Sequence, residues 1–182
     1  VPDPSYPIHP YGFLIAGAKV KRIKMSNEEI FLKSLTSSIQ KYKNKIKAIV
    51  INYPNNPTTK VVDLNFYKEL VKVCERNSIW ILSDLAYSEI YFDDIPPPSI
   101  LQVKNAKKIS VEFSSMSKSY NMPGWRIGFA SGNRTLIAAL ARIKSYLDYG
   151  AFTPIQVAAA TALNGSQEHV ENIRNLYTDS LW

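Results

Sequence analysis

One segment could bind and react with a phosphorylated aldehyde. Lys118 lies between small hydroxyl residues that include Ser115 and Ser117, and Arg126 follows it eight residues later. A lysine that attacks a carbonyl needs a depressed pKa, whereas a phosphate monoester is bound by hydroxyl donors and by the planar fork of a guanidinium. The segment supplies both sets of groups. Taken alone, the pattern also fits an exposed polar loop whose lysine faces water.

A second candidate, Asp84, follows the short apolar run from 79 to 83 and precedes Tyr87 by three residues. An aspartate at the end of a buried strand is costly unless it meets a cation or several hydrogen-bond donors. A protonated pyridine nitrogen is one such cation, and the pairing would turn that ring into an electron sink. Tyr87 could reach the phenolate edge of the same ring. In isolation, Asp84 could equally be the N-cap of a following helix.

A third candidate, Asn56, lies in the segment 53–59, directly after the β-branched run 46–51. Pro54 and Pro57 block both helix and strand pairing, so the segment is predicted to be a turn. At a strand end, the Asn56 amide could reach a ring oxygen or a carboxylate.

Together, the three motifs resemble the class I/II aminotransferases of fold type I, which depend on pyridoxal 5'-phosphate. The motifs are Asn-Pro-Thr at 56–58, Asp-x-Ala-Tyr at 84–87, and Ser-x-Ser-Lys at 115–118 followed by Arg126. The resemblance implies a three-layer α/β/α fold with a mostly parallel sheet, as an incomplete PLP-transferase large domain. It also implies a partial cofactor-binding domain over 1–165 and the start of an interdomain helix over 166–182.

The same resemblance assigns roles to the candidate residues. Lys118 is expected to be the Schiff-base lysine, which also carries the proton between the substrate α-carbon and the cofactor. Asp84 would pair with the pyridine nitrogen, and Tyr87 and Asn56 would hold the oxygen on the ring. The residues expected to bind the phosphate are Ser115, Ser117 and Arg126.

The family resemblance extends to the amino-terminal segment, and the sequence departs from the family pattern elsewhere. The opening segment 3–10 resembles the one whose aromatic side chain stacks on the cofactor, which nominates Tyr6. Thr59 stands where the family usually has glycine, and because a Cβ disfavours positive φ, the turn is expected to be altered. The family's glycine-rich phosphate-binding helix start and its carboxylate-binding arginine are not found. A sheet shortened in this way should expose an edge and an apolar face, so we expect a homodimer or a complementing piece.

Strands and helices alternate along the chain, which independently predicts a mostly parallel sheet covered on both faces. The predicted strands span 19–24, 46–50, 79–83, 107–113 and 126–131. The predicted helices span 26–41, starting at a capping box, then 64–77, capped by Asp63, and 134–147, 153–163 and 166–182. Lys118 would then lie at the carboxyl end of a strand, where open α/β sheets bind their ligands.

Composition narrows the class of protein. With 182 residues, 46% of them hydrophobic, the chain is expected to form one domain. The net charge of +7 is spread thinly, which argues against nucleic-acid binding. Cys74 is the single cysteine, so we expect no intrachain disulfide and a cytoplasmic location. No apolar run is long enough to span a membrane, and the spacing of His9 and His169 predicts no metal site.

Three functional interpretations remain. The chain could be part of an aminotransferase that exchanges amino groups between an amino acid and a 2-oxo acid. It could also be an inactive remnant, or a module that binds the cofactor without turnover. Segment 145–154 resembles the alanine and aspartate aminotransferase branches, but the sequence does not tell which amino acid is used.

Overall fold

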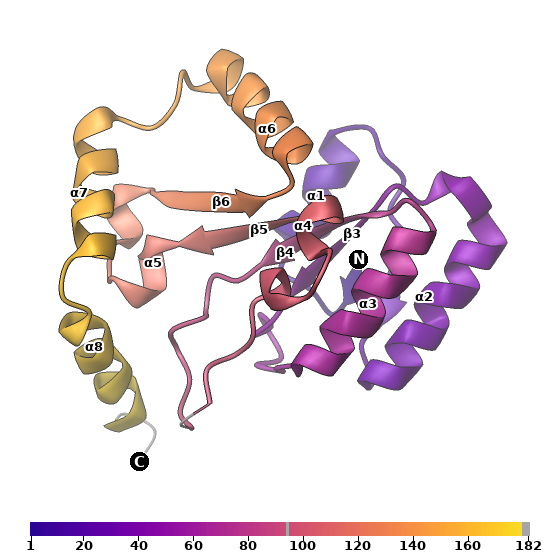
Figure 1. Cartoon of the computed structure of the whole chain (residues 1–182), viewed down its shortest axis with the longest axis horizontal. Helices are drawn as coiled ribbons and strands as arrows, with labels where there is room; N and C mark the ends of the chain where they lie inside the picture. The colour runs from indigo at the N-terminus through magenta and orange to yellow at the C-terminus, as the bar shows by residue number, and fades with distance from the viewer. Residues whose placement is uncertain (94, 180–182) are drawn as a thin grey trace.

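A four-stranded sheet forms the centre of the protein (Figure 1). The computed structural model describes residues 1–93 and 95–179. The strands are β1 (Pro2–Asp3), β2 (Ile23–Lys24), β3 (Ala48–Asn52), β4 (Trp80–Asp84), β5 (Ser110–Ser115) and β6 (Gly128–Gly132). In the central sheet, β3, β4 and β5 run parallel in that order, and β6 pairs antiparallel with β5. The predicted α/β class with a mostly parallel sheet is confirmed.

Helices lie on both faces of this sheet. The α-helices are α1 (Ile8–Ile15), α2 (Glu28–Tyr42), α3 (Leu64–Arg76), α4 (Ala106–Ile109), α5 (Met116–Ser119), α6 (Arg134–Leu147), α7 (Thr153–Asn164) and α8 (Glu168–Asp179). Among the described residues, the short 3-10 helices are η1 (Lys43–Lys45), η2 (Ile100–Gln102) and η3 (Pro123–Trp125). Figure 1 shows α2 and α3 side by side on one face, while α6, α7 and α8 extend from β6 around the other end of the sheet.

The hydrophobic core lies between the sheet and the α2–α3 pair. Alternate residues of β3 point into it, and Ile51 is fully buried. From α3, Tyr67 and Leu70 are also fully buried, because apolar residues recur on one stripe of the helix. This core holds β3 and β4 in parallel register, with Asn52 opposite Asp84 at their carboxyl ends.

Side-chain caps set the helix starts. Asp63 Oδ1 accepts from the Phe66 N–H at 2.8 Å, as predicted for α3. At α2 the capping residue is Asn27, whose Oδ1 accepts from the Ile30 N–H at 2.8 Å. The predicted capping box over 26–29 is therefore wrong in detail, since a single Asx-type cap starts the helix.

Two predicted strands differ from the structure. Residues 19–24 contribute only β2, which pairs with β1 outside the central sheet. Residues 107–109 belong to α4, because β5 pairs with β4 only from Ser110 onward and the Ser110 hydroxyl donates back to the Ala106 carbonyl at 2.7 Å. Consequently β5 extends to Ser115 and ends at the candidate site.

The predicted helix over 166–182 begins at Glu168 and is described to Asp179; positions 180–182 lie outside the described residues. Within the described chain, no helix is both long and apolar enough to cross a membrane.

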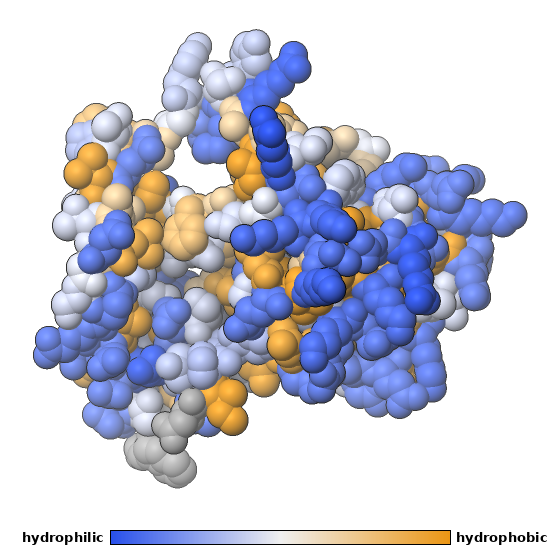
Figure 2. All heavy atoms as spheres, in the orientation of Figure 1, coloured by the Kyte–Doolittle hydropathy of each residue, from blue (hydrophilic) through white to orange (hydrophobic). Residues whose placement is uncertain are grey.

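Large apolar side chains are exposed at the β6–α7 end of the molecule. Tyr146 is 81% exposed and Tyr149 is 94% exposed, and the exposed set extends to Phe129, Leu147, Phe152 and Val157. In Figure 2, hydrophobic surface appears along α7 and β6, whereas the outer surface of α2 and α3 is mostly hydrophilic. An apolar surface of this kind is typical of an interface.

Candidate active site at the carboxyl ends of the strands

Asp84 is the last residue of β4, and two donors orient its carboxylate. Its Oδ2 accepts a hydrogen bond from His9 Nε2 at 2.9 Å, and its Oδ1 accepts from the Ala86 N–H at 3.1 Å. Because a carboxylate only accepts, Nε2 carries the hydrogen. His9 is buried, whereas the Asp84 side chain is 25% exposed and can meet a further cation. Residues 86–89 form turns, so the N-cap interpretation of Asp84 is wrong.

A cavity of about 520 Å³ opens beside this pair, between α1 and the sheet. Asp84 and Ser115 both line it, together with Phe113 of β5. The Tyr6 ring contacts the His9 ring edge to face, with centroids 5.8 Å apart. The structure therefore brings Tyr6 close to the Asp84 carboxylate through His9.

Hydrogen bonds join the ends of β3 and β4 to the 53–59 turn. The Asn52 amide donates to the Asp84 carbonyl at 3.0 Å, and its oxygen accepts from the Asn56 N–H at 2.8 Å. Asn56 Nδ2 in turn donates to the Tyr87 hydroxyl at 3.3 Å. Asn56 and Tyr87, both predicted to hold one ring oxygen, are thus adjacent, and Asn52 holds Asn56 to the end of β4.

The turn that carries Asn56 is closed by its own polar groups. Asn55 Oδ1 accepts from the Thr58 N–H and hydroxyl, at 3.1 and 2.6 Å. Thr59 has φ of 58°, in the left-handed region that a residue with a Cβ rarely adopts.

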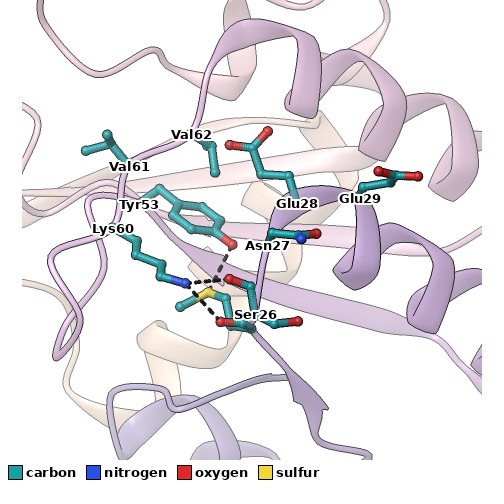
Figure 3. A pocket seen from close by; sticks show the side chains of 9 residues that line it. Ser26, Asn27, Glu28, Glu29, Tyr53, Lys60, Val61 and Val62 are labelled. Atoms are coloured by element: carbon teal, nitrogen blue, oxygen red, sulfur yellow. Dashed lines mark hydrogen bonds between the residues drawn. The ribbon is translucent and has the colours of Figure 1, made fainter.

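After the turn, the Lys60 ammonium donates to the carbonyls of Met25 and Ser26 at 3.2 and 2.7 Å. Figure 3 shows these bonds across a pocket of about 430 Å³ next to the start of α2. In the same pocket, burial and the nearby Asp63 raise the pKa of Glu28. The Lys60 bonds hold the end of the turn to the segment just before α2, and none of the predicted site residues lines this pocket.

Lys118 lies on α5, directly after β5. Its Nζ is 6.0 Å from the centre of the Tyr87 ring. Ser115 caps α5, accepting from the Ser117 N–H at 3.1 Å. The Arg126 guanidinium donates to the Pro123 carbonyl at 2.8 Å on the exposed surface.

A close approach of two strands places Arg126 near this end of β5. Gly128 pairs with Ser115, and a Cβ on Gly128 would lie 2.5 Å from the Ser114 carbonyl oxygen. Only glycine allows this approach. Arg126 is two residues from Gly128 and therefore lies near Ser115 in the backbone, while its guanidinium is bonded to the Pro123 carbonyl.

Two residues of this arrangement were not predicted, His9 and Asn52. His9 lies 75 positions from Asp84, and nothing local in its sequence indicates the pairing. Asn52 had a weak signal, as a polar residue directly after a β-branched run. In the described part of the chain, no three side chains gather as metal ligands.

Comparison with known proteins decides the family. The family model for aminotransferase class I and II matches residues 1–180. The chain belongs to this aminotransferase family. Its members use pyridoxal phosphate.

Individual relatives of this aminotransferase chain are similar over nearly its whole length. The protein named AatC from Rhizobium meliloti (strain 1021) is 53% identical over 97% of the chain. The glutamate-pyruvate aminotransferase AlaC of Escherichia coli (strain K12) is 48% identical over 97% of the chain. The chain spans less than half of these relatives, 44% of AatC and 43% of AlaC.

A solved structure has the same fold. Substrate-bound BacF from Bacillus subtilis matches with a TM-score of 0.89 and 32% identity, over 98% of this aminotransferase chain and 45% of BacF. The chain thus has the fold of part of the BacF structure.

Proposed function

We propose that this chain is the cofactor-bearing part of an aminotransferase that exchanges amino groups between an amino acid and a 2-oxo acid. The observation that carries the proposal is the gathering of Asp84, the Asn56–Tyr87 pair and Lys118 at the carboxyl ends of parallel strands. Ligands of open α/β sheets bind at this edge. The family match over 1–180 supports the same conclusion.

The donor and acceptor groups fit pyridoxal 5'-phosphate. Asp84 offers a partly exposed carboxylate for a ring N–H⁺, and Asn56 and Tyr87 offer an amide and a phenol for a ring oxygen. Ser115 and Ser117 offer hydroxyls for the phosphate, and Tyr6 offers an aromatic face. Arg126 would have to leave the Pro123 carbonyl to join them.

Pyridoxal phosphate supplies an aldehyde for amines and a ring that withdraws electrons from the substrate α-carbon. The Lys118 amine can act as a nucleophile only in its unprotonated form, and as a free amine its Nζ can take a proton from the substrate α-carbon and return it. With the cofactor bound, the Asp84 carboxylate would hold a proton on the ring nitrogen, and the His9 hydrogen bond would keep that carboxylate oriented. Substitution of Asp84 should therefore slow proton transfer more than it weakens binding.

For substrates, we propose glutamate and pyruvate as the first pair to assay, because the name of AlaC states this pair.

The exposed apolar surface at Tyr146 and Tyr149 supports assembly as a homodimer or with a complementing piece. We propose residues 1–165 as the cofactor-binding part and 166–182 as the start of the interdomain helix. The buried Cys74 thiol fits a reducing compartment such as the cytoplasm.

Spectroscopy of the purified chain with pyridoxal phosphate tests the proposal. We expect an absorption band at about 410 to 430 nm that borohydride converts to a stable adduct on Lys118, located by peptide mapping. Lys118→Ala should bind cofactor without this band. A wild-type chain without an adduct at Lys118 would favour an inactive remnant.

Turnover is tested separately, in a glutamate–pyruvate assay with the remaining segments of a family member added. Transfer that depends on Lys118 supports the aminotransferase proposal. An adduct without transfer in any mixture would favour a module that binds the cofactor only.

A further inference from the structure

Lys118 lies in the turn 116–122. Two other segments lie against this turn: the start of α8 and the loop 87–91 after β4. We propose that Tyr120 is a positioning residue, which fixes the turn carrying Lys118 by donating a hydrogen bond to Gln167 directly before α8. The inference rests on the proposed function for the role of Lys118. The contact itself is independent of any cofactor: Tyr120 Oη and Gln167 Oε1 are 2.6 Å apart.

The turn around Lys118 is weakly held by its own backbone. The N–H groups of Tyr120 and Met122 donate to the Met116 carbonyl, and the Asn121 N–H donates to the Lys118 carbonyl. All three bonds are 3.3 Å long, beyond the usual range for N–H···O hydrogen bonds. α5 itself has only four residues. Met116 and Ser119 are buried, and an external contact is the remaining means of fixing the turn that follows them.

Gln167 is suited to provide that contact because other bonds hold its side chain. The two N–H groups of its Nε2 donate to the carbonyls of Gly165 and Ala162, at 2.8 and 3.1 Å. Its own carbonyl accepts from the Val170 N–H at 2.9 Å and so begins α8. The acceptor of the Tyr120 hydroxyl is thus fastened to the end of α7 and to the start of α8.

Two further contacts hold α8 against the candidate site. The His169 ring lies on the Tyr120 ring, with centroids 5.1 Å apart. The Arg174 guanidinium lies over the Tyr91 ring, 4.3 Å from its centre, in the loop that begins with Tyr87. Burial and the Glu89 carboxylate raise the pKa of Tyr120, which keeps its hydroxyl a donor.

These contacts link the position of α8 to the position of the Lys118 amine. A shift of α8 would move Gln167, and with it Tyr120 and the turn that carries Lys118. Tyr120→Phe removes the hydroxyl and keeps the ring on His169. Because Gln167 is exposed, its oxygen can then bind water, so the variant should fold normally.

Hydrogen exchange without cofactor is the first measurement. In Tyr120→Phe, we expect the amides of 120–122 to exchange about two- to tenfold faster, the factor that matches loss of one hydrogen bond. Tyr149→Phe, at a tyrosine that is 94% exposed, is the matched control and should not change this exchange. Unchanged exchange in Tyr120→Phe would overturn the inference.

A double-mutant cycle gives the second measurement. Gln167→Met should speed exchange at 120–122 as much as Tyr120→Phe, and the double variant should add nothing further. Gln167→Met should also lower the melting temperature, since it removes the donor from the α7 carbonyls, whereas Tyr120→Phe should not. Additive effects on exchange would show that the two side chains act separately, against the inference.

The rate of adduct formation on Lys118 connects the contact to function. We expect Tyr120→Phe to slow it about two- to tenfold at an unchanged melting temperature. A wild-type rate in Tyr120→Phe, with faster exchange, would refute a role in positioning Lys118. If the wild-type chain forms no adduct, the proposed function fails, and the exchange measurements still decide whether Tyr120 holds the turn.

Discussion

Thr59→Gly should stabilise the protein, because Thr59 occupies the left-handed backbone region with φ of 58°. An L-residue in this region costs about 1–2 kcal/mol, whereas glycine costs about 0.5–1 kcal/mol in lost chain entropy. Little packing is lost, since Thr59 is exposed and its hydroxyl donates only to the adjacent Thr58 carbonyl. The net gain should be about 0.5–1 kcal/mol in the free energy of unfolding.

Urea denaturation followed by circular dichroism measures this gain. A change of that size corresponds to roughly 1–4 °C in the melting temperature for a chain of this length. Thr59→Ala is the matched control, because it removes the hydroxyl and one methyl but keeps the Cβ that causes the strain. It should recover less stability than glycine.

The reasoning would be refuted if Thr59→Gly were no more stable than the wild type while Thr59→Ala gained stability. That outcome would mean that the Thr59 side chain, and not its backbone angle, lowers the stability of the protein. The cofactor adduct on Lys118 should be unchanged in both variants, because Asn56 is held independently by Asn52.

Three further predictions concern a close approach of two strands, a buried histidine and a buried thiol. Gly128→Ala should destabilise by about 1–3 kcal/mol and reduce the adduct yield on Lys118, because its Cβ would lie 2.5 Å from the Ser114 carbonyl; urea titration and borohydride trapping measure both. His9→Phe should cost about 1–3 kcal/mol and weaken cofactor binding, since Asp84 loses one of its two donors; unchanged affinity in a cofactor titration would contradict this. Burial raises the pKa of the Cys74 thiol from 9.0 to about 12, so the folded state keeps a proton that the unfolded chain releases. Its contribution to stability is complete below pH 9 and falls by about 1.4 kcal/mol per pH unit as the pH rises toward 12. Cys74→Ala should lose stability less steeply than the wild type over this range, measured by urea titration at each pH.

The helices around the core could be predicted because their signals are local. The Asp63 cap bonds a residue only three positions away, and the apolar stripe of α3 lies within one segment. The same holds for the turn that carries Asn56, whose prolines restrict their own backbone. The prediction was wrong where strand pairing decides the secondary structure. Residues 107–109 were predicted to be part of a strand but have no partner on β4.

The sequence by itself determined the family, the α/β class and the candidates Lys118, Asp84, Tyr87 and Asn56, because residue types and spacing within short motifs carry that information. Only the tertiary structure decided how these groups are oriented. The His9–Asp84 bond spans 75 positions, and Arg126 turns to the Pro123 carbonyl in spite of its place in the motif. Such contacts depend on which strands pair and how helices cover the sheet, and those long-range arrangements leave no periodic or local mark in a single sequence.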